Sequence, residues 1–412
     1  MKKTIFNLSL SLIFLFLGLM INGMGQSVLF SVLAPISRTI GFMDSGVGVI
    51  ISCSAAILVL FSLLWGRILD RINIKYVFIF GLVSFGAGTY IFAYVLDLGQ
   101  KEVYSPESIL LLLIIIRMIY AAMTAGTHPA AMAYVTKLKN EKERVSSIAL
   151  ISSSYSIGLV VGPVLVFVYQ SGNVLSPVYL ISYLAIIFAI ASIFILKDSP
   201  PNATVEVKEH KNSSLKFWDR RILPTLISLM LVNVIFSCLQ QSLGFLTQDL
   251  FLISGDEASR KTGVILSTFA LAMLFTQVIL IQRYKINYKI MIYLGIALVG
   301  VGLVCLTFAT VYIDFVAIIL SIVITGVGIG YLIPSLQTHL TFFVLSNEQG
   351  KVAGYIFSFS AMGYVIGPLL GTGLIGIATW LPYLMCLALL TISASCLLIG
   401  SKEVSKKTLA MG

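Results

Sequence analysis

The chain has 412 residues, of which 58% are hydrophobic and only 11% are charged. A soluble domain of this size carries about 25% charged residues, so this composition excludes a water-covered surface and makes the lipid bilayer the main solvent. The formal net charge of +10 raises the alternative of a nucleic-acid partner, which the placement of the charges along the chain decides.

Long apolar runs follow one another along the whole chain. A helix needs roughly 20 mostly apolar residues to cross a hydrocarbon core about 30 Å thick, and twelve runs meet that length. The first run follows Lys2 and Lys3 but is too long for a signal peptide and lacks a clear cleavage site, so we expect an uncleaved helix. The predicted spanning helices lie at about residues 6–34, 46–66, 75–96, 108–134, 145–169, 177–196, 222–250, 262–282, 289–311, 315–340, 352–375 and 379–400.

The basic residues are distributed unevenly between the loops. With the N-terminus in the cytoplasm, 22 of the 27 Lys and Arg residues fall on the cytoplasmic side and four on the outer side. This is the positive-inside pattern, and it predicts that both termini lie on the cytoplasmic side. We expect the membrane to be the plasma (inner) membrane of a prokaryote. The positive charge therefore predicts orientation and requires no nucleic acid.

A polar, charged stretch divides the helices into six and six. It predicts an N-terminal six-helix bundle at 1–196, a cytoplasmic linker at 197–221, a C-terminal six-helix bundle at 222–400 and a cytoplasmic tail at 401–412. Little sequence remains outside the helices, so there is no room for a soluble catalytic domain.

The two halves repeat each other in sequence. The shift is 214 residues early in each half and 205 later, and the longer loop near 97–107 explains the change. A duplicated six-helix unit is typical of transporters that work by alternating access. The matched glycines are Gly81, Gly86 and Gly88 with Gly295, Gly300 and Gly302, and the matched prolines are Pro129 and Pro163 with Pro334 and Pro368.

The loop after the second helix carries a signature. Gly66, Asp70, Arg71 and Lys75 resemble the G-x-x-x-D-R-x-G-R-R loop of the major facilitator superfamily, with Asn73 at the second glycine. The resemblance implies a charge relay that latches the two bundles on the cytoplasmic side. The simpler alternative is a loop ion pair.

The fifth and eleventh helices carry matched small-residue motifs. The first is similar to the Gly-x-x-x-Gly-Pro signature of the drug–proton antiporter branch of that superfamily, which implies export. Close helix packing is the plain interpretation of both motifs. Their residues are Gly158, Gly162 and Pro163, and Gly363, Gly367 and Pro368.

Arg117 lies within the predicted fourth helix, near the middle of the membrane, with Ala121 four residues later. It resembles the buried arginine of the family's R-x-x-x-G pattern. An intramembrane charge is costly and faces a bundle interior or a wet cavity. We expect it to bind an anionic group or order a proton path, and the alternative is a structural arginine.

Five further polar residues complete the predicted substrate and proton cavity. Gln26 and Gln240 match at the 214-residue shift, and Gln241 follows, so amides lie at equal depth in the first and seventh helices. Interhelical hydrogen bonding is an equal alternative for them. Asp249 and His128 are candidate proton carriers, and interfacial placement is the alternative for both.

These features predict an all-α membrane protein of the major facilitator fold. We expect a secondary transporter and not an enzyme, exporting a small neutral or anionic solute such as a drug or a carboxylate siderophore. The energy source would be the proton gradient, with no cofactor, no metal site and a monomeric working form. A proton-coupled importer is the alternative, and a membrane enzyme or sensor is a distant third.

Overall fold

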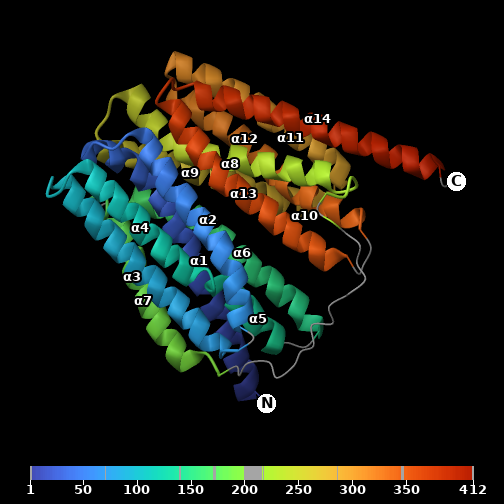
Figure 1. The fold of residues 1–412 in the computed structure, drawn as a ribbon, viewed down its shortest axis with the longest axis horizontal. Helices are drawn as coiled ribbons and strands as arrows, with labels where there is room; N and C mark the ends of the chain where they lie inside the picture. The colour runs from blue at the N-terminus through green and yellow to red at the C-terminus, as the bar shows by residue number, and fades with distance from the viewer. Residues whose placement is uncertain are drawn as a thin grey trace. The chain divides into compact units, whose positions relative to one another are not determined.

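The computed structural model describes residues 2–69, 71–138, 141–169, 173–198, 216, 218–284, 286–344 and 348–410. Throughout these residues the regular secondary structure is helical (Figure 1). The helices are α1 Lys2–Ile40, α2 Asp44–Leu69, α3 Ile74–Gln100, α4 Pro106–Thr124, α5 Thr127–Leu138, α6 Glu141–Val168, α7 Ser176–Ile195, α8 Leu223–Phe251, α9 Gly255–Phe275, the π-helix η1 Thr276–Leu280, α10 Ile281–Tyr284, α11 Tyr288–Tyr312, α12 Phe315–Phe342, α13 Gln349–Ile375 and α14 Leu381–Ala410.

Helices cover every apolar run predicted from the sequence. Among the described residues, eleven helical stretches are long and apolar enough to cross a bilayer. The predicted run at 145–169 falls on α6, where the apolar part, Ser153–Val168, is shorter than the other eleven. Twelve spans therefore remain a prediction.

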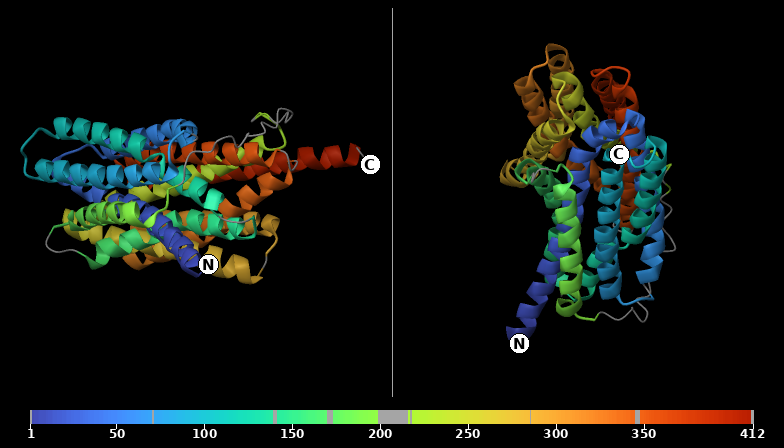
Figure 2. Two further views of the ribbon diagram at one scale, coloured as in Figure 1. Left: turned by 90° about the horizontal axis from the view of Figure 1, so that it is seen from below. Right: turned by 90° about the vertical axis from the view of Figure 1, so that its left-hand side faces the viewer.

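Both chain ends are helical beyond the apolar stretches. The first turns of α1 and the last turns of α14 project past the neighbouring helices (Figure 2). The tail predicted from residue 401 onward continues α14 as helix to Ala410.

The predicted fourth helix is broken into α4 and α5 at Ala125 and Gly126. Pro129 has no N–H for the Ala125 carbonyl, and its ring crowds that carbonyl, so an unbroken helix is disfavoured there. The indole Nε1 of Trp65 donates to the Ala122 carbonyl at 2.8 Å. A side chain of α2 thus satisfies a carbonyl beside the break, as a buried backbone group requires.

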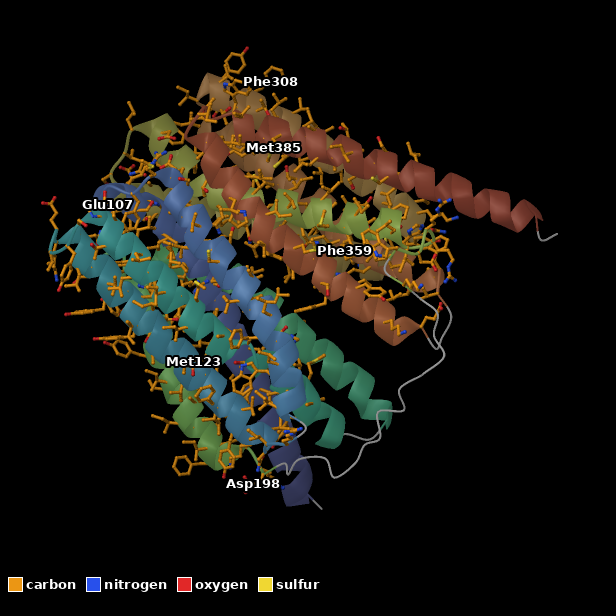
Figure 3. The ribbon with its side chains drawn as sticks, in the orientation of Figure 1. Glu107, Met123, Asp198, Phe308, Phe359 and Met385 are labelled. Atoms are coloured by element: carbon orange, nitrogen blue, oxygen red, sulfur yellow. The ribbon has the colours of Figure 1, made fainter. Side chains whose placement is uncertain are left out.

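The structure divides into two compact units. The first comprises Met1–Val205 with Ile253–Ser267, and the second comprises Glu206–Leu252 with Thr268–Gly412. In the first unit, α1 packs against α6, α7 and α3, and α4 packs against α2 and α3. Glu107 at the start of α4 and Asp198 after α7 lie at opposite ends of this bundle (Figure 3).

The second unit repeats this arrangement with its own helices. Its α8 packs against α13 and α14, and α11 packs against α12. Asn73 caps α3 by accepting from the Lys75 N–H, and Asn287 caps α11 by accepting from the Lys289 N–H. These pairs match at the 214-residue shift, so the duplication extends to how helices begin.

Matched glycines make matched helix contacts. A Cβ on Gly88 of α3 would overlap the Tyr120 side chain of α4, and a Cβ on Gly302 of α11 would overlap Thr325 of α12. The glycines are related by the 214-residue shift and their partners by the 205-residue shift. The repeat is therefore visible in the packing of each unit and not only in the sequence.

In each unit the first and fifth helices approach most closely at glycines. Cβ atoms on Gly158 and Gly162 of α6 would overlap backbone carbonyls of α1, and Cβ atoms on Gly363 and Gly367 of α13 would overlap those of α8. A serine hydroxyl lies at each contact. Ser27 lies 3.4 Å from the Gly158 carbonyl, and Ser237 donates to the Gly363 carbonyl at 2.9 Å.

Gly367 should tolerate no side chain, whereas Gly354 on the same helix has open space where a Cβ would lie. We expect Gly367→Ala to destabilise the protein by about 1–3 kcal/mol because the helices must separate. We expect Gly354→Ala to leave stability unchanged or raise it by up to about 1 kcal/mol, because alanine favours helix. Thermal unfolding of the purified variants checks both, and equal melting temperatures would contradict the packing argument.

Candidate functional site

Arg117 of α4 lies inside the first unit with 4% of its surface exposed. Its Nη2 donates a 2.5 Å hydrogen bond to Gln26 Oε1 of α1. The guanidinium carbon lies 4.8 Å from the centre of the Tyr120 ring, within range of a cation–π interaction. Two predicted site residues, 91 positions apart in the chain, are thus brought together.

The charge of Arg117 is incompletely compensated. Within the described part of the chain no carboxylate lies within ion-pair distance of it, and its buried Nε has no hydrogen-bond partner. Its other electrostatic neighbour is the phenol of Tyr155 in α6. A buried cation with neutral neighbours and a spare donor can hold an anionic or acceptor group of a ligand.

Gln240 and Gln241 of α8 lie inside the second unit, 7% and 1% exposed. Neither amide oxygen has a hydrogen-bond partner among the described residues. A buried acceptor without a donor costs roughly 1–3 kcal/mol. These amides therefore offer acceptors that water or a ligand would satisfy.

The sequence shifts of the repeat relate the Arg117–Gln26 pair to two residues of the second unit. Gln240 matches Gln26, but the position that matches Arg117 is Ile322 of α12, which is fully buried. The first unit pairs Gln26 with a guanidinium, whereas the second unit has isoleucine at the position that corresponds to Arg117 in the sequence repeat. The 205-residue shift points to Ile322, which the site predicted from the sequence did not include.

The two candidate proton carriers belong to different units. His128 is exposed in the first turn of α5, after the break, and is not among the contacts of Arg117. Asp249 is partly buried near the end of α8, where it interacts electrostatically with the buried Tyr383 of α14. Within the first unit the structure does not join His128 to the Arg117–Gln26 pair, and Asp249 belongs to the second unit.

The predicted latch loop is described in part. Asp70 lies outside the described residues, Gly66 lies within α2, and Arg71 is exposed. Lys75 is largely buried, and its Nζ lies 3.5 Å from Asp198 Oδ1. Asp198, the residue that follows Lys197 at the start of the predicted linker, is thus a partner of the loop that sequence reasoning missed.

The eleven membrane-length helical stretches of the described residues and the buried polar groups within each unit are those of a polytopic membrane protein. A family model described as Major Facilitator Superfamily matches residues 15–254 and 223–411. The chain belongs to this superfamily and resembles its drug–proton antiporter branch, and its family is one of transporters and not of enzymes.

Known proteins resemble the chain over most of its length. Multidrug resistance protein 2 of Bacillus subtilis (strain 168) is 25% identical over 93% of this chain and 92% of that protein. Multidrug resistance protein 1 of the same strain is 23% identical over 91% and 92%. The crystal structure of a bacterial homolog of the human lysosomal transporter Spinster, inward-facing and occupied, shares the fold with a TM-score of 0.73 at 14% identity, covering 95% of this chain and 96% of that one.

The bond between Arg117 and Gln26 can be measured as a coupling. Arg117→Met leaves the Gln26 amide without its donor, Gln26→Leu removes the acceptor of a buried cation, and the double variant removes both groups. We expect the double variant to be more stable than the sum of the single losses predicts, by roughly 1.5–3 kcal/mol, because each single change strands a buried partner. Unfolding of the four proteins in detergent checks this, and additive losses would show that the two groups do not interact.

Proposed function

We propose that this protein exports a small neutral or anionic solute, a drug or a metabolite such as a carboxylate siderophore, in exchange for protons by alternating access. The multidrug resistance proteins of Bacillus subtilis support export, since they resemble this chain over nearly its full length. The observation that carries the preference for solute charge is the buried Arg117, whose guanidinium has neutral neighbours among the described residues.

The charge balance argues against a dedicated exporter of polycations. A buried guanidinium repels cations and attracts groups that accept its hydrogen bonds. In the second unit the amide oxygens of Gln240 and Gln241, which have no hydrogen-bond partner among the described residues, suit a hydroxyl or N–H donor of a solute.

The proposal includes an arrangement in the membrane. Twelve spans place both termini and the linker at 197–221 in the cytoplasm of the plasma membrane, because this orientation collects the basic residues on one side. One chain carries both halves of the repeat, so the monomer is the proposed working form. Asp70 and Arg71 are proposed to form the cytoplasmic latch, and Asp249 and His128 to carry protons.

Everted membrane vesicles with a respiration-driven acidic lumen test the direction and the role of Arg117. An exporter that exchanges solute for protons should alkalinise the lumen when the solute is added, whereas a proton-coupled importer should not. We expect such a response to polycarboxylates or neutral drugs in the wild type. In Arg117→Ala it should fall at least tenfold, because one lost charge-assisted hydrogen bond is worth roughly 1.5–3 kcal/mol.

Arg117→Lys and Arg260→Ala serve as controls in the same vesicles. Lysine keeps the charge without the planar fork, so an intermediate response is expected. Arg260 is exposed in α9, and its removal should have no effect. A response to lipophilic cations that survives Arg117→Ala would overturn the preference for anions, and lumen acidification on adding solute would identify an importer.

Gln240→Leu separates a ligand-binding amide from a structural one. Leucine removes a buried acceptor that has no partner among the described residues, so we expect the melting temperature to stay equal or rise. Transport should nevertheless lose affinity, with the apparent KM rising about fivefold to tenfold, since a typical hydrogen bond is worth about 1 kcal/mol and somewhat more when buried. A lower melting temperature with unchanged KM would make Gln240 a structural residue.

A further inference from the structure

The residues just before α8 form a fixed turn. Arg221 donates from Nη2 to Asp219 Oδ2 at 2.7 Å and from Nε to both carboxylate oxygens at 3.1 Å, and its backbone N–H donates to Asp219 Oδ1 at 2.9 Å. The Asp219 N–H donates to the Lys216 carbonyl at 2.9 Å, and the Leu223 N–H donates to the Asp219 carbonyl at 2.9 Å. The hydrogen bonds that Asp219 accepts raise the pKa of the Arg221 guanidinium above its ordinary value.

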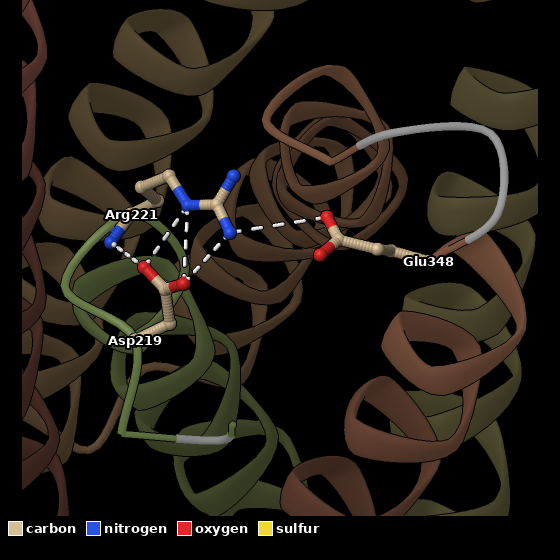
Figure 4. Close-up of polar contacts among 3 residues, drawn as sticks. All are labelled: Asp219, Arg221 and Glu348. Carbon is tan, nitrogen blue, oxygen red and sulfur yellow. Dashed lines mark hydrogen bonds and ion pairs between the residues drawn. The ribbon is translucent and has the colours of Figure 1, made fainter. Parts of the chain in front are cut away.

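The same arginine joins this turn to the start of α13. Arg221 Nη2 lies 3.8 Å from Glu348 Oε2, and only 4% of the Glu348 side chain is exposed (Figure 4). Glu348 is the residue immediately before α13. One guanidinium therefore lies between two carboxylates and ties the end of the predicted linker to the body of the second unit.

Neighbouring side chains of the fixed turn are either buried in the unit or exposed at its surface. Arg221 faces its carboxylate partners and Ile222 is fully buried, whereas 67% of Trp218 is exposed. Lys216 and Arg220 are exposed as well. A short, anchored segment thus presents one large aromatic side chain and two basic ones at its surface.

We propose that Lys216, Trp218 and Arg220 form a binding surface for the headgroups of anionic phospholipids in the bilayer. The segment directly precedes the membrane-spanning α8, so it lies at the level where headgroups are found. Tryptophan favours that interface, because its ring is apolar while its N–H can still donate. Lysine and arginine beside an anionic leaflet add electrostatic attraction.

The geometry distinguishes this surface from general positive-inside charge. Orientation needs only basic residues in a loop and no ordered backbone or exposed tryptophan. Here Asp219 and Glu348 neutralise Arg221 and hold the turn, while the two basic residues on either side of Trp218 are exposed. The exposed basic residue Lys351, one helical turn after Glu348, adds to the positive character of this end of the unit.

Quenching of Trp218 fluorescence by brominated lipids tests the proposal directly. The purified full chain is reconstituted into phosphatidylcholine bilayers that contain equal fractions of either brominated phosphatidylglycerol or brominated phosphatidylcholine. The fluorescence of the Trp218→Phe variant comes from the other two tryptophans, and it is subtracted from that of the wild type. We expect the Trp218 signal to be quenched preferentially by brominated phosphatidylglycerol, and equal quenching by the two lipids would overturn the proposal.

Charge variants then identify the source of the preference. Lys216→Gln and Arg220→Gln should each reduce the selectivity for phosphatidylglycerol about fivefold, equivalent to about 1 kcal/mol per basic residue at an anionic surface. Arg260→Gln, which removes an exposed charge from α9, is the matched control and should leave the selectivity unchanged. Unchanged selectivity in the two turn variants would also overturn the proposal. The readout needs no substrate, so its failure would leave the proposed transport function untouched.

Discussion

The close approach of the first and fifth helices is the constraint on which each unit depends. A backbone can lie against a neighbouring backbone only where side chains are absent, and the glycines of α6 and α13 supply that absence. Ser27 and Ser237 then place hydroxyls beside the carbonyls of Gly158 and Gly363. Within each unit these contacts fix how α1 lies against α6 and how α8 lies against α13.

The two units share one pattern of helix packing but carry different buried polar groups. In the first unit Gln26 binds the guanidinium of Arg117, whereas in the second unit the amide oxygen of Gln240 has no hydrogen-bond partner among the described residues. The low dielectric of the interior raises the free-energy cost of both groups, since a cation without a counter-charge and an acceptor without a donor each cost more there than in water. The same physics that makes these groups costly to bury makes them effective binding groups for a solute.

Periodic and compositional signals predicted the helices well, because length and hydropathy are local properties of the chain. The break between α4 and α5 was not predicted, because a proline alone does not identify such a break. Pro334 matches Pro129 in the repeat and yet lies within the unbroken α12. Contacts between residues far apart in the sequence were not predicted either. The contacts of Arg117 with Gln26 and of Lys75 with Asp198 depend on how whole helices pack, and residue spacing along the chain carries no such information.

The two units of the repeat differ at the position of Arg117 in the way that a wild type and a substituted variant differ. The second unit has Ile322 at the position that corresponds to Arg117 by the 205-residue shift, and Gln240 at the position that corresponds to Gln26 by the 214-residue shift. Most residues of α8 are buried, so the second unit packs without a cation at that position. The architecture of the second unit therefore forms without a cation at this position, and the proposed role of Arg117 in the first unit is to bind the transported solute.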